Sequence, residues 1–218
     1  MTINILTLFP EFFHSGLKTS IIGKAIDKGL FSVNLVNIRD FATDKHKTTD
    51  DRPFGGGPGM VLKIEPIDKA LETLGVKKGQ AGKLILLLSA RGKQFNQAMA
   101  KDLSKLDELT LICGHYGDVD GRVATHLVDG QVSLGEFVLT GGEPAALVMV
   151  DAVGRLLPGV LGNESSLEGE THSEPGLVSA PAYTRPAEYK GWRVPEVLLS
   201  GDHAKIKRWK EEKARVES

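Results

Sequence analysis

The stretch KLILLLSARGKQFNQAMAKDLSKLDELTLICG (83–114) carries the pattern that decides the fold. Two of its segments, KLILLLS (83–89) and ELTLICG (108–114), are short apolar runs typical of strands that are buried on both faces. The segment between them, QFNQAMAKDLSKL (94–106), has the apolar spacing of an amphipathic helix. A buried strand, a helix and a second buried strand together predict an α/β protein with a parallel sheet flanked by helices.

The same alternation continues on both sides of this stretch. Gly29 and Gly75 follow two helical patterns and mark where those helices should end. The further predicted strands are NILTLF (4–9), FSVNLVNI (31–38) and, with a weaker pattern, QVSLGEFVL (131–139). The further predicted helices are residues 19–28, IEPIDKALETLG (64–75) and the largely apolar GGEPAALVMVDAVGRLLPG (141–159).

The composition suits one globular domain of good size, or one domain with a smaller appendage, since 41% of the 218 residues are hydrophobic. The formal net charge of −1 excludes a global basic field, so a nucleic acid would have to be held by a local patch. The longest wholly apolar run, LILLL (84–88), is far shorter than the ~20 residues of a membrane helix. The first residues lack the basic and apolar regions of a signal peptide, and the single cysteine, Cys113, excludes an intrachain disulfide and a CxxC metal site. We therefore expect a soluble, cytoplasmic protein without a membrane segment.

The last quarter of the chain has a different composition. Residues 162–186 show little periodicity and much Ser, Pro and Gly, and a connection of this length is either functional or a linker. Residues 187–218 include a charged helical segment, SGDHAKIKRWKEEKARVES (200–218), with Asp202 as its N-cap. We therefore expect an α/β domain over 1–161, a flexible loop over 162–186 and a small helical domain over 187–218.

Ligands of parallel α/β sheets bind beyond the carboxyl ends of the strands. Three glycine-containing loops are predicted to lie there: SARG (89–92), GHYGDVDG (114–121) and TGGEP (140–144). Glycine lets the backbone approach a ligand closely, so these loops predict a ligand site. A lone histidine in such a loop, here His115, is more often a polar surface residue than a catalyst.

A fourth glycine-rich segment, DDRPFGGGPGM (50–60), matches neither common nucleotide-binding motif. A Walker loop needs Lys followed by Ser or Thr, whereas this segment continues as GGGPGMVLK, and Pro58 breaks the helix start that a dinucleotide fingerprint requires. The residues alone leave a structural hinge and a binding loop equally open. The same holds for the tail, where Lys205, Arg208 and Trp209 would either contact nucleic acid or form a solvated helix face.

Several stretches together resemble one family closely. In chain order they are LFPEFF, RDFATDKHKTTDDRPFGGGPGM, CGHYG, SLGEFVLTGGE, RLLPGVLG, YTRP and VPEVLLSGDHAKIKRW. From residue 1 to about residue 210 the chain is similar to bacterial tRNA (guanine-N1)-methyltransferases of the SPOUT class. The resemblance implies a deep trefoil knot in the carboxyl-terminal half of the α/β domain. It also implies S-adenosylmethionine as methyl donor and a homodimer with its active site between the subunits.

The resemblance assigns site residues as well. The cofactor would lie against three loops, at Leu88, Ser89, Gly114, Tyr116, Gly117, Ser133, Leu134, Gly135, Phe137, Leu139, Gly141 and Gly142. The tRNA would contact the glycine-rich segment and the tail, at Asp51, Arg52, Gly57, Pro58, Gly59, His203, Lys205 and Arg208. The family suggests a need for Mg²⁺, but no residue of this chain is assigned as a metal ligand.

Methylation of guanine N1 needs a base that removes the N1 proton and a cation or hydrogen-bond donor that stabilises the charge spreading onto O6. The resemblance assigns the O6 role to Arg155, which taken alone could simply complement a helix dipole. In the family the base is an aspartate of the long loop. Here Glu170 is the best match to that aspartate, and Glu168 is the second.

The chain departs from the family's usual pattern around this site, and its tail domain is shorter than usual. CGHYGD places His115 and Gly117 where the family has an arginine and an acid, with Asp118 next to them, and LSARG places Arg91 at the cofactor rim. The leading hypothesis is a tRNA (guanine-N1)-methyltransferase that modifies the guanosine directly 3′ of the anticodon. Two alternatives stay open: a catalytically weak homologue that binds tRNA or cofactor, and a SPOUT methyltransferase that acts on another RNA guanine.

Overall fold

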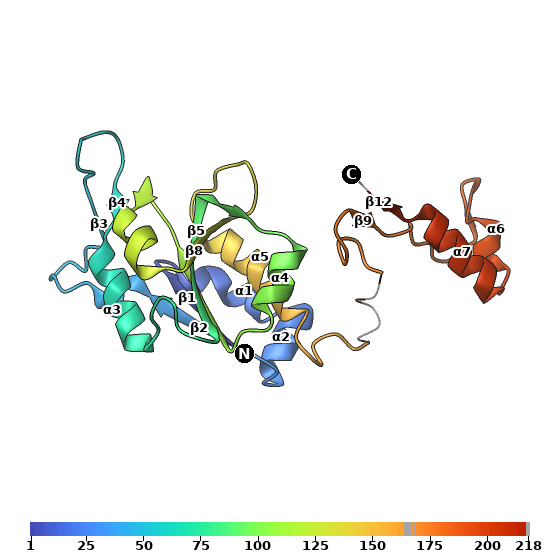
Figure 1. Ribbon diagram of the computed structural model, residues 1–218, viewed down its shortest axis with the longest axis horizontal. Coiled ribbons are helices and arrows are strands. Elements are labelled where there is room, and N and C mark those ends of the chain that lie inside the picture. Colours follow the sequence, from blue (N-terminus) through green and yellow to red (C-terminus); the bar gives the residue numbers. More distant parts are fainter. Residues whose placement is uncertain (164–166, 168, 217–218) are drawn as a thin grey trace. The chain divides into compact units, whose positions relative to one another are not determined.

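The computed structural model of the chain describes residues 1–163, 167 and 169–216. The chain divides into two compact units, Met1–Gly162 and Asn163–Ser218 (Figure 1). The first unit contains a five-stranded sheet with helices on both faces, and the described part of the second contains short strands and helices.

Every neighbouring pair of strands in the five-stranded sheet is parallel, and the strand order is β2-β1-β6-β5-β8. The strands are β1 (Thr2–Thr7), β2 (Ser32–Asn37), β5 (Lys83–Gln94), β6 (Glu108–Cys113) and β8 (Gly130–Ser133). The strands β5 and β6, which come from residues 83–114, lie side by side. The predicted parallel sheet flanked by helices is therefore confirmed.

Two helices of the first unit have an end that the sequence specifies, α4 at its start and α3 at its end. At the start of α4, the side chain of Asn96 accepts a hydrogen bond from the backbone N–H of Met99 at 2.9 Å. α3 ends as predicted at Gly75, whose φ of 67° is in the left-handed region. The helices are α1 (His14–Leu17), α2 (Ser20–Asp27), α3 (Ile64–Leu74), α4 (Gln97–Leu103) and α5 (Glu143–Gly154), with 3-10 helices at Pro10–Phe13 and Ile38–Phe41 and a π-helical turn at Val123–Leu127.

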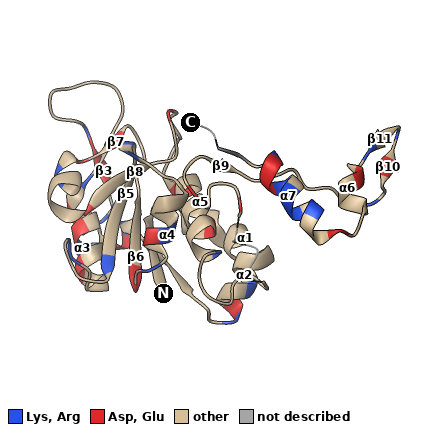
Figure 2. Cartoon of the chain, turned by 45° about the vertical axis from the view of Figure 1, so that its right-hand side comes forward, with Lys and Arg blue, Asp and Glu red and all other residues tan. Residues whose placement is uncertain are grey.

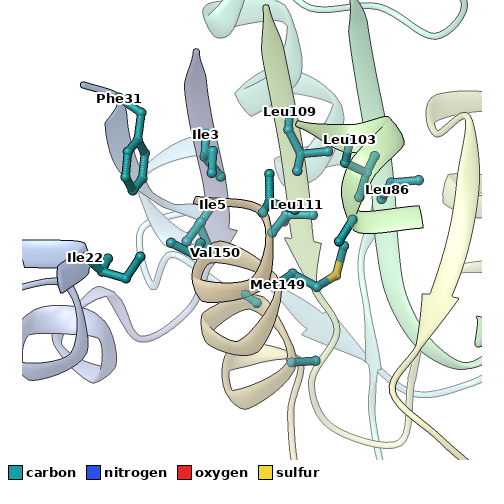
Figure 3. Packing of buried hydrophobic residues seen from close by; sticks show 14 of the residues in the cluster. Ile3, Ile5, Ile22, Phe31, Leu86, Leu103, Leu109, Leu111, Met149 and Val150 are labelled. Atoms are coloured by element: carbon teal, nitrogen blue, oxygen red, sulfur yellow. The ribbon is translucent and has the colours of Figure 1, made fainter. Parts of the chain in front are cut away.

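Both faces of the sheet are buried, which is why its strands read as nearly continuous apolar runs. Successive residues of β1 point to opposite faces: Ile5 belongs to the cluster shared with α2, α4 and α5, and Leu6 to the cluster shared with α3. On the first face, Met149 and Val150 of α5 point toward the strands (Figure 3). The apolar composition of α5 follows from this position, because seven of its twelve residues are buried.

Two predicted boundaries at the carboxyl edge are wrong. The predicted strand 131–139 ends at Ser133, because the chain leaves the sheet there and forms a loop over 134–142 that leads into α5. The predicted helix 94–106 is shorter at its start, because β5 continues to Gln94 before α4 begins.

The segment SARG (89–92), predicted as a loop, is also different from expectation. It continues β5 beyond Leu88, and the pairing of β5 with β8 shifts register between Leu88 and Lys93. Such an irregularity inserts extra residues into one strand and bends it. At this bend Gly92 packs directly against the backbone of β8.

A second sheet of the first unit, with strand order β3-β4-β7, holds the glycine-rich segment. Its strands are β3 (Asp50–Asp51), β4 (Val61–Leu62) and β7 (Asp118–Val119). β3 and β4 flank the segment as antiparallel neighbours, and β4 pairs in parallel with β7, which follows CGHYG. Backbone pairing therefore fixes the two glycine-containing segments to one another.

Within its described residues, the second unit contains two small two-stranded sheets and two helices. Its elements are β9 (Leu177–Val178) paired with β12 (Arg215–Val216), β10 (Glu188–Tyr189) paired with β11 (Trp192–Arg193), α6 (Glu196–Leu199) and α7 (His203–Lys213). Asp202 caps α7 as predicted, since its carboxylate accepts hydrogen bonds from the N–H groups of Ala204 and Lys205, both at 3.1 Å. None of the side chains that the structure describes in this unit, up to residue 214, is buried.

Candidate functional site

A cavity of about 290 Å³ lies at the carboxyl edge of the sheet, where β6 and β8 end, β5 bends and α5 begins. Its size is near the lower end of the range for small-molecule sites, roughly 300–1,000 Å³. Eleven of the twelve residues that the resemblance assigns to the cofactor line it: Leu88, Ser89, Gly114, Tyr116, Gly117, Ser133, Leu134, Phe137, Leu139, Gly141 and Gly142. Gly135 is the exception and does not line the cavity.

Glycine is required around this cavity because backbones pack directly against one another. The N–H of Gly142 donates a hydrogen bond to the carbonyl oxygen of Gly114 at 2.8 Å. A Cβ atom at position 142 would lie 2.7 Å from Cα of Cys113 and 3.0 Å from the backbone nitrogen of Gly114, too close for a side chain. A Cβ atom at position 114 would lie 3.2 Å from the carbonyl oxygen of Leu88. The bend of β5, the end of β6 and the start of α5 thus form one close-packed backbone frame.

This backbone frame fits the adenosyl part of S-adenosylmethionine. Leu88, Val132, Leu134 and Leu139 supply apolar side chains, and the glycines let a ligand approach the backbone. Apolar walls with a few polar groups are typical of small-molecule and cofactor sites. The lining is therefore that of a small-molecule site and would suit the cofactor that the resemblance implies.

A buried carboxylate lies at the start of α5, beside the cavity. Glu143 is 4% exposed, and its Oε1 accepts a hydrogen bond from Oγ1 of Thr7 at 2.7 Å. Burial raises the pKa of the Cys113 thiol well above its ordinary range, and the nearby charge of Glu143 raises it further. The sequence reasoning missed Glu143. Its signal was an acid placed directly after two glycines, at the start of an otherwise apolar helix.

His115 is not the exposed surface residue that its loop position favours. Its side chain lines the cavity and contacts the rings of Phe9 and Tyr116, with centroid distances of 4.9 and 5.1 Å. Its Nδ1 is 3.9 Å from Oε2 of Glu143 and has no hydrogen-bond partner within the described part of the chain. His115 therefore belongs to the wall of the cavity.

Two of the residues that depart from the family pattern, Arg91 and Asp118, form an ion pair at the cavity rim. Nη2 of Arg91 is 2.8 Å from Oδ2 of Asp118, and both residues line the cavity. Their side chains are 77% and 39% exposed, so the pair contributes little to stability, typically less than about 1 kcal/mol. The pair connects β5 to β7, a link that the sequence reasoning did not predict.

The end of the glycine-rich segment lies directly beside the cavity. The N–H of Gly117, a lining residue, donates a hydrogen bond to the carbonyl oxygen of Met60 at 2.9 Å. Gly57 and Gly59 have φ values of 116° and 88°, which side chains rarely adopt. Only the end of the segment is therefore shown to lie near the cavity, where an added Cβ on Gly59 would be 4.0 Å from Cα of Gly117. The other residues assigned to tRNA belong to β3 or to the loop between β3 and β4: Asp51, Arg52, Gly57 and Pro58.

Arg155, the candidate for the O6 role, lies at the far end of α5. The helix begins beside the cavity with Glu143 and ends at Gly154, where an added Cβ would lie 3.1 Å from the ring of Phe31, the residue before β2. It therefore runs from the carboxyl edge of the sheet to the amino edge. At 1.5 Å per residue, Arg155 is about 18 Å along the axis from Glu143. Its position at the carboxyl end of the helix is as predicted, but it does not line the cavity of its own chain.

The remaining assigned residues belong to the second unit or lie outside the description. His203, Lys205 and Arg208 are on α7, and Glu170 precedes β9. Glu168 lies outside the described residues. Among residues 1–163, 167 and 169–216, no three His, Cys, Asp or Glu side chains come together as metal ligands would. The same described ranges hold no helix that is long and apolar enough to cross a membrane.

The whole chain matches one protein family. The family model described as tRNA (Guanine-1)-methyltransferase TrmD matches residues 1–218. The chain belongs to this family. Proteins named tRNA (guanine-N(1)-)-methyltransferase from Carboxydothermus hydrogenoformans and Geobacter metallireducens are each 50% identical to it. The first alignment covers 98% of this chain and 83% of the relative, and the second covers 100% of this chain and 88% of the relative.

Membership in the tRNA (guanine-1)-methyltransferase family confirms the resemblance that the motifs carried. The chain holds the cavity and the end of the glycine-rich segment together at the carboxyl edge of the sheet, while Arg155 lies at the amino edge.

Proposed function

We propose that this protein transfers a methyl group from S-adenosylmethionine to N1 of the guanosine directly 3′ of the tRNA anticodon. The observation that carries the proposal is the cavity, which eleven of the twelve expected cofactor residues line in a chain that belongs to the family. The proposal includes the finer features that the family suggests: a trefoil knot around the cavity, a small helical domain that holds the tRNA, and a cytoplasmic location.

We further infer that two copies of the chain build each active site. Arg155 is about 18 Å from the start of α5 in its own chain, so a base held at one cavity needs the arginine of a second chain. Exposed apolar side chains beside the cavity and on α5 support a subunit contact in this region: Phe137, Val138 and Val148. A homodimer of this kind supplies the cavity from one subunit and Arg155 from the other.

The roles of the residues follow from what the reaction needs. Bound S-adenosylmethionine would supply a methyl group that is already electrophilic, because it is attached to a positively charged sulfur. The carboxylate of Glu170 takes the N1 proton of guanine, and the guanidinium of Arg155 stabilises the negative charge on O6. The packed frame around Gly142 holds the donor in a fixed orientation, and alignment of the reactants supplies much of the remaining rate.

The direct test incubates the purified chain with S-adenosylmethionine and an unmodified tRNA transcript that has G directly after the anticodon. We expect N1-methylguanosine at that position, detected as a stop in primer extension, and reactions with and without Mg²⁺ test the ion that the family suggests. Glu170→Gln should lower the rate at least ~10²-fold if it removes the base. Binding of tRNA without methylation would instead identify a catalytically weak homologue, and a stop at another guanine would identify a different RNA specificity.

Mixing of subunits tests the shared active site. Arg155→Ala removes the O6 partner, and Gly142→Ala damages the cavity because an added Cβ would clash with Cys113. Each variant alone should be inactive. In randomly mixed dimers half are heterodimers with one intact site, so mixing should restore about a quarter of the wild-type rate. Native mass spectrometry verifies that heterodimers form. If the mixture is nevertheless inactive, each active site takes Arg155 and the cavity from the same chain.

A further inference from the structure

The second unit exposes two aromatic side chains on one short hairpin. Tyr189 of β10 and Trp192 of β11 are directly opposite in register, so their side chains lie on the same face. Their ring centroids are 6.0 Å apart, with an interplanar angle of 57°. Tyr189 is 55% exposed and Trp192 is 72% exposed, which is high for large aromatic residues, whose surface soluble proteins mostly bury.

The hairpin holds this aromatic face in place through its turn and its next pair of residues. Lys190 and Gly191 form the two-residue turn, with φ values of 52° and 83°, as in the tight turns that match the twist of the strands. Glu188 and Arg193 form the neighbouring cross-strand pair, and Nε of Arg193 is 2.8 Å from Oε2 of Glu188. The two rings are therefore presented to solvent by a short and well-defined element.

One basic side chain lies at the rings, and a helix of the same unit is rich in basic residues. Nζ of Lys190 is 5.4 Å from the ring centroid of Tyr189, a distance at which a cation interacts with an aromatic face. In the same unit, helix α7 carries more basic than acidic residues (Figure 2): Lys205, Lys207, Arg208, Lys210 and Lys213 against Glu211 and Glu212. A protein partner would have to desolvate such charges, whereas the phosphates of a nucleic acid pair with them.

We propose that the aromatic face formed by Tyr189 and Trp192 stacks an unpaired base of the RNA substrate. The inference rests on the proposed function, which makes a tRNA the substrate and brings unpaired loop bases to the protein. Aromatic side chains stack unpaired bases with little sequence preference, and the loss of one such contact weakens binding about 5- to 150-fold. The methyl transfer itself does not need these side chains, so they set the affinity for RNA and leave the chemical step unchanged.

The experiment uses Trp192 as its own reporter. The chain has two tryptophans, Trp192 and Trp209, so a Trp209→Phe background leaves the fluorescence of Trp192 alone. We expect an unmodified tRNA transcript to quench this fluorescence and a blunt RNA duplex to leave it unchanged, because paired bases are not available for stacking. In the same background, Trp192→Phe keeps an aromatic ring and should retain most of the tRNA affinity. Trp192→Leu should bind tRNA about 5- to 150-fold more weakly in filter binding.

Parallel measurements separate the possible outcomes. Because Trp192 is exposed, Trp192→Leu should leave the melting curve and the methylation rate at saturating tRNA unchanged, so a weaker affinity cannot come from unfolding. If Trp192→Leu binds tRNA with unchanged affinity and still methylates it, the stacking proposal is wrong and the proposed function is unaffected. Unchanged tRNA affinity together with loss of self-association in sedimentation would show that the face binds protein, which also overturns the inference. A parent chain that neither binds nor methylates tRNA would overturn the proposed function itself.

Discussion

The two units of the chain differ in how their side chains are buried. The first unit buries both faces of a parallel sheet, with residues such as Ile5 and Met149 fully buried, and its cavity stands on that core. In the second unit none of the side chains that the structure describes is buried, and aromatic side chains such as Trp192 are largely exposed. A packed core fixes the backbone frame that a small cofactor cavity needs. An exposed surface leaves side chains available to a large ligand such as RNA.

The largest effect on ligand binding should come from breaking the packed frame of the first unit with Gly142→Ala. An added Cβ would lie 2.7 Å from Cα of Cys113. Either the start of α5 or the end of β6 would therefore have to move, which would change the shape of the cavity. We expect the affinity for S-adenosylmethionine, measured by calorimetry, to fall at least ~100-fold, or about 2.7 kcal/mol. Gly121→Ala is the matched control, because an added Cβ there meets no atom within 4 Å. If Gly142→Ala binds S-adenosylmethionine as tightly as the wild type, the backbone around the cavity can adjust to the added methyl group. The first unit would then be less rigid than its packing indicates.

Removing a buried side chain should destabilise the first unit more than removing a partly exposed side chain destabilises the second. Met149→Ala should lower the free energy of unfolding by about 2–5 kcal/mol, because Met149 is fully buried. Ile206→Ala on α7, where the side chain is partly exposed, should cost about 1 kcal/mol or less. Both tryptophans lie in the second unit, so urea unfolding followed by fluorescence reports that unit, and far-UV circular dichroism reports mainly the first. Met149→Ala should shift the circular dichroism transition more than the fluorescence transition. Equal shifts would show that the chain unfolds as one cooperative body.

Burial of a thiol in the first unit should also make the stability of the protein depend on pH in the alkaline range. The pKa of the Cys113 thiol is raised well above its ordinary value of 9.0, first by burial and then by the charge of Glu143. The unfolded chain therefore loses the thiol proton at a lower pH than the folded chain. The free energy of unfolding should fall as pH rises above 9.0, by at most about 1.4 kcal/mol per pH unit. Cys113→Ala should flatten this slope in urea titrations, and an unchanged slope would assign it to other groups.

The sheet could be predicted because strands that are buried on both faces appear as apolar runs, as KLILLLS does in β5. The end of β8 could not be predicted in the same way. QVSLGEFVL has the alternation of a strand, but the chain leaves the sheet at Ser133, and Phe137 and Val138 are exposed beside the cavity. Apolar residues that face a ligand or a subunit look the same in a sequence as apolar residues that face a core.

The loops that form the cavity could be predicted from the sequence, but the contacts between them could not. Glycine content indicated the loops, and the family motifs indicated individual residues within them. The contact between Thr7 and Glu143 joins residues 136 positions apart, and no local pattern indicates it. The position of Arg155 at the opposite edge of the sheet was also beyond prediction, because it depends on the direction in which α5 crosses the strands.

The smallest effects should come from one exposed ion pair in each unit. The pairs Arg91–Asp118 at the cavity rim and Arg193–Glu188 in the β10–β11 hairpin both have nitrogen–oxygen distances of 2.8 Å. Both arginine side chains are about three-quarters exposed, so solvent screens the two pairs similarly. Replacing either arginine by glutamine should change the free energy of unfolding by less than about 1 kcal/mol in urea titrations. A larger loss for Arg91→Gln would mean that the rim pair stabilises the first unit in a way that the hairpin pair does not stabilise the second.

Only Arg91→Gln should change the affinity for the cofactor. S-adenosylmethionine carries a net positive charge at neutral pH, so the substitution removes a like charge from the rim and leaves the carboxylate of Asp118 to attract the ligand. Two unit charges about 4 Å apart in water interact by about 1 kcal/mol, which corresponds to binding that is about fivefold tighter. Calorimetry on both variants measures this difference, with Arg193→Gln as the control that removes the same charge from the second unit. If both variants bind the cofactor more tightly to the same extent, the effect comes from the net charge of the protein. If Arg91→Gln does not bind it more tightly, the rim pair does not influence cofactor binding.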